Sequence, residues 1–147
     1  MAIAEYDVVI HRDAMSVYDF LLDARNLPSW RDGVRGVELV SGATGAKGAV
    51  YRQSLAAPAG RTECCDVEIT EARPGAEIRF TVLAGPERTR GGYYLSTEGT
   101  STRVRFALEG EARGLLARLS SRFRRRMRAE VGQLDQLKAV LEQEPEL

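Results

Sequence analysis

The chain has 147 residues, of which 44% are hydrophobic and 29% are charged. That is the length and composition of one globular domain, and it excludes an intrinsically disordered chain. The 21 basic and 21 acidic residues cancel, so the net charge gives no whole-molecule field that would indicate a nucleic-acid or membrane partner.

The few cysteine and histidine residues limit which disulfides and metal sites the chain could form. The cysteines are the adjacent Cys64 and Cys65, and the histidine is His11. Adjacent cysteines make a poor disulfide framework, so we expect a reduced, cytoplasmic protein. Zinc sites need several spaced ligands, so we expect no metal, and no motif predicts a cofactor. No apolar run approaches the roughly 20 residues that would cross a bilayer, and Met1–Glu5 lacks the features of a signal peptide.

A strand and two short helices are the first elements predicted along the chain. Residues 6–11 alternate between two faces, which predicts a half-buried strand. Asp13 is a suitable N-cap for an amphipathic helix over about 14–23. Pro28 suits the first turn of a second short helix.

A series of alternating segments follows, separated by turn signals such as Pro74-Gly75. Their pattern of apolar and polar side chains predicts an antiparallel sheet with one wet face. The segments cover residues 34–40, 49–55, 61–72, 78–82, 93–96 and 103–109.

From about residue 113 the apolar spacing becomes helical. The apolar side chains recur every three or four residues as far as Leu141. They form one continuous stripe, which predicts a single helix of about 30 residues. A sheet of six or seven strands whose apolar face is covered by one long helix is an α+β sandwich.

The order of these motifs resembles a known family. Val17–Asp23 followed by Asn26–Trp30 is similar to its amphipathic helix that ends in Asp, followed by Asn, Pro and Trp. Gly45 and Gly48 are similar to its turn before a strand, and Gly99–Val104 is similar to its hairpin into the last strand. The family is the START-like (SRPBCC) superfamily with the helix-grip fold, and within it the polyketide cyclase/dehydrase group.

This resemblance implies an α+β fold in which a curved antiparallel sheet wraps around a long C-terminal helix. It implies six to seven strands, two short helices after the first strand, and one domain over residues 1–147. It also implies an apolar cavity between the sheet and the C-terminal helix.

Eleven side chains are candidates for contacting a ligand in such a cavity, and plain core packing is the alternative for each. Tyr51 and Gln53 share one face of their strand, while Arg52 and Ser54 share the other. The strand register therefore decides which pair lies inside. The candidates are Trp30, Tyr51, Gln53, Val67, Phe80, Tyr93, Leu95, Phe106, Leu119, Phe123 and Met127.

Two functions follow from the implied cavity. The first is binding of a small, largely hydrophobic ligand such as a lipid, an isoprenoid or a polyketide-like molecule. The second is a polyketide cyclase or aromatase, for which the residues assign no catalytic set. Its pocket would assist enolisation by proton transfer. Candidate groups for that role are Tyr51, Gln53, Tyr93 and an inward arginine such as Arg52 or Arg90.

Arginines gather in the predicted C-terminal helix. Residues 113–128 carry seven arginines and no acid, whereas residues 129–147 carry five acids and one lysine. This arrangement opposes the helix macrodipole, so helix stability does not explain it. A third function is therefore interaction with an anionic partner. A nucleic acid would contact Arg118, Arg122 and Arg125, and the alternative is a solvated face. The sequence does not indicate an oligomeric state.

Overall fold

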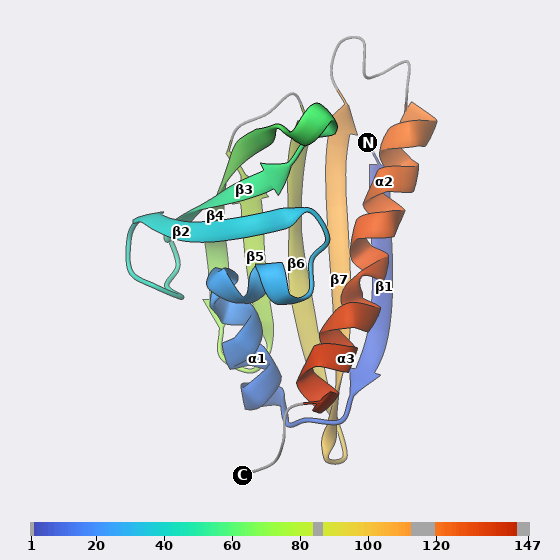
Figure 1. Cartoon of the computed structure of the whole chain (residues 1–147). Coiled ribbons are helices and arrows are strands. Elements are labelled where there is room, and N and C mark those ends of the chain that lie inside the picture. Colours follow the sequence, from blue (N-terminus) through green and yellow to red (C-terminus); the bar gives the residue numbers. More distant parts are fainter. Residues whose placement is uncertain (1, 84–86, 113–119, 144–147) are drawn as a thin grey trace.

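A curved seven-stranded sheet with helices against one face makes up the structure, a computed structural model that describes residues 2–83, 87–112 and 120–143 (Figure 1). Neighbouring strands are antiparallel throughout, in the order β1-β7-β6-β5-β4-β3-β2. The strands are β1 (Ala2–Ile10), β2 (Val34–Ser41), β3 (Val50–Ala56), β4 (Thr62–Arg73), β5 (Glu77–Val82), β6 (Glu87–Glu98) and β7 (Ser101–Ala112).

The helices connect strands or follow the last one. Helix α1 (Ala14–Leu22) and the 3₁₀ helix η1 (Ala24–Ser29) lead from β1 to β2, and the short η2 (Pro58–Gly60) joins β3 to β4. After β7, α2 (Ser120–Gly132) and α3 (Leu134–Gln143) run along β1 and β7 (Figure 1). The predicted architecture, a curved antiparallel sheet around a C-terminal helical segment, is confirmed.

Helix α1 begins where the sequence predicts it. The Asp13 carboxylate accepts hydrogen bonds from the Ser16 hydroxyl at 2.6 Å and from the Ser16 backbone N–H at 3.1 Å. These bonds favour the charged carboxylate, so they lower the pKa of Asp13. Val17 and Leu21 are buried on the side of the helix that faces the core.

Strand β1 begins at Ala2 and not at residue 6, because it pairs residue by residue with β7 from Ala2–Gly110 to Ile10–Thr102. The sheet face turned toward α2 and α3 is called the inner face here. Tyr6 lies on this face and its hydroxyl donates to the Asp135 carboxylate of α3 at 2.8 and 2.9 Å. This contact holds α3 against the edge strand.

The predicted C-terminal helix is present, with one interruption. Helix α2 ends at Gly132 and α3 begins at Leu134, with Gln133 in a turn between them. The Gln133 N–H donates to the Glu130 carbonyl at 3.1 Å, which is the shorter i to i−3 spacing of a 3₁₀ turn. Residues 113–119 of the predicted helix lie outside the described residues.

The apolar stripe nevertheless continues across the break. Its spacing of three or four residues is kept, so α2 and α3 bury the same side. The buried stripe residues are Met127, Val131, Leu134, Leu137 and Leu141.

We predict that Gly132→Ala leaves the protein as stable as before or stabilises it by up to about 1 kcal/mol, because alanine is the better helix former. A Cβ at Gly132 would meet no atom within 4 Å. Gly91→Ala in β6 is the contrasting variant, because its Cβ would clash with the Ala107 carbonyl oxygen. It should cost about 1–3 kcal/mol. Urea unfolding followed by circular dichroism measures the free energy of unfolding of both variants. A Gly132→Ala variant that is less stable than the wild type would contradict the argument that the space beside Gly132 is empty.

Candidate functional site

Four aromatic rings pack together on the inner face. Trp30, which follows η1, is 2% exposed and makes edge-to-face contacts with Tyr93 and Phe106, with centroids 6.1 and 6.2 Å apart. Tyr93 and Phe106 lie 4.7 Å apart on the neighbouring strands β6 and β7, and Phe80 of β5 lies 5.8 Å from Tyr93. Each such pair contributes roughly 0.5–1.5 kcal/mol beyond its buried area. These four rings, the aromatic cluster, fasten the η1–β2 connection to the sheet.

A single guanidinium lies against this cluster. The Arg31 side chain is 16% exposed, and its guanidinium carbon lies 5.5 Å from the Trp30 ring centroid and 5.4 Å from that of Phe106. Its Nε donates to the Gln133 side-chain carbonyl at 2.9 Å. Its Nη2 lies 3.7 Å from a carboxylate oxygen of Glu130. A cation that is nearly buried thus gains both aromatic and polar partners.

The Tyr93 phenol lies near the Arg31 guanidinium. Burial raises the pKa of Tyr93, while the positive charge of Arg31 partly offsets that rise. Tyr93 is therefore a neutral hydrogen-bond donor beside a fixed cation. An oxygen with developing negative charge is the ligand group that such a pair would stabilise.

Part of the inner face remains accessible. Inward side chains of β6 and β7 such as Tyr93 and Phe106 are buried, but several on β3, β4 and β5 are only half-buried. Across these strands Gln53 pairs with Cys65, and Val67 pairs with Val82. The half-buried set, called the open inner surface, consists of Gln53, Leu55, Cys65, Phe80 and Val82.

The open inner surface faces helix α2. Burial raises the pKa of Cys65, and the negative charges of Asp66 and Glu130 raise it further. Glu130 belongs to α2, so the thiol and this helix lie near each other across the inner face. The surface therefore lies between β3–β5 and α2, with Arg31 and Tyr93 among its polar neighbours.

The structure brings many of the predicted candidates together and separates others. Trp30, Phe80, Tyr93 and Phe106 form the aromatic cluster. Gln53 belongs to the open inner surface, Val67 is buried beside it, and Met127 is buried on α2. Leu119 lies outside the described residues, as does the side chain of Phe123.

Two candidates lie apart from this group. Tyr51 is 1% exposed, and its hydroxyl accepts a hydrogen bond at 2.8 Å from the Gly45 N–H, so it holds the turn before β3. Leu95 pairs with Val104, beyond the Tyr93–Phe106 pair along the strands and further from β3 and β4. In the observed register of β3, Tyr51 and Gln53 lie on the inner face, and Arg52 and Ser54 lie on the opposite face.

The inward arginine proposed for a cyclase is neither Arg52 nor Arg90. Arg52 is exposed on the opposite face, where its Nε lies 2.9 Å from the Asp66 carboxylate. Arg90 also points outward and forms an ion pair with Glu109. Strand alternation puts both residues outside. The inward arginine is Arg31, and the sequence carries no signal for it because it lies in a turn after a short helix, where no periodicity applies.

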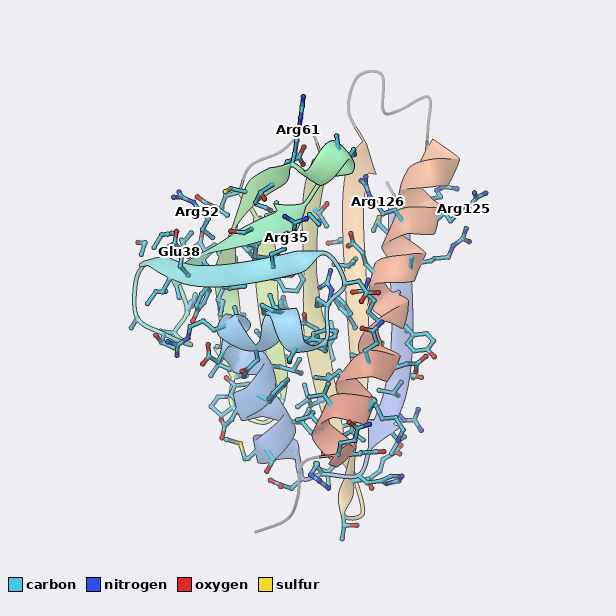
Figure 2. The ribbon with its side chains drawn as sticks, viewed as in Figure 1. Arg35, Glu38, Arg52, Arg61, Arg125 and Arg126 are labelled. Atoms are coloured by element: carbon cyan, nitrogen blue, oxygen red, sulfur yellow. The ribbon has the colours of Figure 1, made fainter. Side chains whose placement is uncertain are left out.

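Exposed arginines occupy α2. Arg124, Arg125, Arg126 and Arg128 are all exposed, and Figure 2 shows Arg125 pointing away from the sheet. Arg118 lies outside the described residues, and so does the side chain of Arg122. A nucleic-acid partner for these arginines stays a prediction.

Among the described ranges, no group of three or more His, Cys, Asp or Glu residues is placed to hold a metal ion. In the same ranges, no helix has the length and apolar character that crossing a membrane requires.

We predict that Tyr93 ionises in the folded protein only above its ordinary pKa of 10. An unfolded tyrosine loses its proton near pH 10, so deprotonation favours the unfolded state above that pH. The contribution of the neutral Tyr93 is complete below about pH 10 and declines as pH rises toward its folded pKa. The difference in 295 nm absorbance between the wild type and Tyr93→Phe measures this titration. A Tyr93 step at or below pH 10 would contradict the burial argument.

The chain matches a family model described as polyketide cyclase / dehydrase and lipid transport over residues 1–142. No curated protein sequence matches it. Similar solved structures include the di-domain ARO/CYC BexL from the BE-7585A biosynthetic pathway. It has 21% identity and a TM-score of 0.74, and the match covers 99% of this chain and 48% of that chain.

Two further structures cover the chain at nearly full length. TTHA0849 from Thermus thermophilus is 20% identical with a TM-score of 0.73, covering 93% of this chain and 94% of that chain. A START superfamily protein from Mycobacterium smegmatis is 13% identical with a TM-score of 0.70, covering 97% and 95%. At these identities the likeness shows the fold alone. The family match over residues 1–142 shows more: this chain belongs to the polyketide cyclase / dehydrase and lipid transport family.

Proposed function

We propose that this chain acts as one START-like domain that binds a small, largely hydrophobic molecule on the open inner surface. A lipid, an isoprenoid or a polyketide-like compound has the required character. The observation that carries the proposal is the incomplete burial of inward side chains such as Leu55, Phe80 and Val82. Apolar side chains that point toward the core and still contact solvent gain free energy when a ligand covers them.

The polar neighbours of this surface suggest how such a ligand would be oriented. Gln53 offers an amide, and the Arg31–Tyr93 pair offers hydrogen-bond donors at the aromatic cluster. A few polar groups in a mainly apolar lining are the usual means of fixing a small molecule's orientation. The preferred ligand would therefore carry an oxygen on an apolar body. A reduced, cytoplasmic location is part of the proposal, since Cys64 and Cys65 are both free.

Two measurements identify and locate the ligand. Native mass spectrometry of gently purified protein, followed by denaturation, would release and identify any bound molecule. In a Cys64→Ser variant, the rate at which N-ethylmaleimide modifies Cys65 reports on the surface itself. A ligand that covers the surface should slow this reaction.

We predict that Val82→Glu weakens binding of the neutral dye Nile red about tenfold or more. A carboxylate on this surface would have to lose water when the dye binds, which costs at least about 1.4 kcal/mol. Ser54→Glu is the matched control, because Ser54 pairs with the exposed Cys64 on the opposite face. Fluorescence titration measures both. Absence of saturable dye binding to the wild type, or equal losses in the two variants, would sink the proposal.

A second candidate function is catalysis of polyketide cyclisation, which the Arg31–Tyr93 pair favours. A guanidinium and a neutral phenol can both donate hydrogen bonds to a ketone oxygen while a neighbouring carbon loses its proton. The negative charge that develops on that oxygen would lie against Arg31. The aromatic cluster would hold a flat intermediate with most water excluded.

We predict that Tyr93→Phe lowers cyclised product from a poly-β-ketone substrate about 100-fold if this second function is correct, because one oxyanion donor is lost. Tyr94→Phe, the next residue on the opposite sheet face, should leave the product unchanged. Chromatography of the products provides the measurement. An identical product distribution with wild type, Tyr93→Phe and no protein would dispose of the catalytic function and leave ligand binding standing.

A further inference from the structure

A hollow of about 490 Å³ lies on the outer face of the sheet, the face turned away from α2 and α3. Its lining includes Ala107 of β7, which stands directly opposite Gly92 of β6 in the strand register. The pairs on either side are long: Tyr94 opposite Arg105, and Arg90 opposite Glu109. The Tyr94 ring covers Gly92, so the depression, called the outer hollow here, lies over Ala107. Its volume is within the range of small-molecule sites.

Tyr94 forms a flat apolar part of the outer hollow. A Cβ at Gly92 would stand 3.0 Å from the Tyr94 hydroxyl oxygen, so the phenol lies across the glycine. The guanidinium carbon of Arg105 lies 5.0 Å from the Tyr94 ring centroid. Ile3, at 64% exposure, adds an apolar side chain from β1.

The charges around the outer hollow leave a positive excess. Its lining holds Arg79, Arg90 and Arg105 against Glu5 and Glu109. The Arg90 charge is compensated by Glu109 in a direct ion pair. Among the described residues, Arg105 has a cation–π contact and no carboxylate within ion-pair distance.

Two carboxylates lie near Arg79: Glu77, which it shares with Arg73, and Glu71, which stands opposite it in the strand register. Arg79 lies 3.0 Å from the Glu77 carboxylate, and Arg73 lies 2.9 Å from the other oxygen of the same group. One carboxylate thus serves two guanidinium groups. Arg79 from β5 and Arg105 from β7 flank β6, and both are exposed, so an anion can approach either guanidinium.

We propose that the outer hollow binds a small organic anion with a flat apolar body, such as an aromatic carboxylate. The carboxylate would lie between Arg79 and Arg105, which supply charge-assisted hydrogen bonds. The ring would cover Ala107 beside Tyr94. Strand alternation places Arg79, Tyr94 and Arg105 on the face of the sheet opposite the open inner surface, and Phe80 of β5 borders both sites.

The test is an NMR titration of the ¹⁵N-labelled protein with 2-naphthoate. Saturable shifts should centre on the amides of Gly91, Gly92 and Ala107. Arg79→Gln and Arg105→Gln should each raise the Kd about tenfold, the loss of one charge-assisted hydrogen bond. Arg52→Gln, which removes an outward arginine away from the hollow, should leave the Kd unchanged. Inorganic phosphate should bind about tenfold more weakly, because it lacks the flat body.

Several results would overturn the proposal. These are the absence of saturable shifts, shifts centred on Gln53 and Cys65, equal affinity in Arg105→Gln and wild type, or phosphate binding as tightly as naphthoate. Nile red binding is measured on the same variants. Arg79 and Arg105 lie outside the open inner surface, so Arg79→Gln and Arg105→Gln should both still bind Nile red. A failure of the anion site is therefore distinguishable from a failure of the open inner surface to bind its ligand.

Discussion

The contacts of the largely buried Arg31 guanidinium are the interaction on which the arrangement of the inner face depends. The guanidinium lies over the rings of Trp30 and Phe106, and its Nε bonds to the Gln133 side chain. Leaving a cation in such a place without partners would cost several kcal/mol. The turn between α2 and α3 presents the Gln133 carbonyl to Arg31 and, at 3.1 Å, to the Asp32 N–H. One side chain therefore ties the connection after η1 to the junction of the two C-terminal helices.

Incomplete covering of the sheet is the second constraint. Helices α2 and α3 lie along β1 and β7 at one edge, where Val104 and Phe106 have no exposed surface (Figure 1). Among the residues that the structure describes, no helix of this length packs against the inward side chains of the strands at the opposite side, and Leu55 and Val82 stay half-buried. A sheet wider than its helical cover leaves apolar area that a small molecule can bury. The binding proposal rests on this imbalance more than on any single residue.

The alternation of apolar and polar residues along the strands allowed much of the fold and of the candidate site to be predicted from the sequence. It places Val67 and Tyr93 on the inner face, and the order of motifs indicates the helix-grip architecture. The choice between Gln53 and Arg52 required the strand register of the structure. The alternation could not locate Arg31, because a side chain in a turn takes its direction from tertiary contacts. It could not reveal the break at Gln133 either, since the apolar stripe runs through it unbroken. The deciding hydrogen bonds come from Arg31 and Asp32, about a hundred residues away in the chain.

The glycine pair in β6 shows how closely the two faces are coupled. Gly91 points inward, where a Cβ would stand 2.7 Å from Leu108 Cδ2 and 3.1 Å from the Phe80 ring. Because glycine has no Cβ, the side chains of the aromatic cluster can pack closely against β6. Gly92 points outward, and because it has no side chain, the Tyr94 ring can lie across the strand at this position. Glycine in a strand interior normally weakens it, and it often marks a close approach of other groups. Here two consecutive glycines permit close packing inside and place the Tyr94 ring beside the outer hollow. The same two residues therefore shape both surfaces to which we assign ligands.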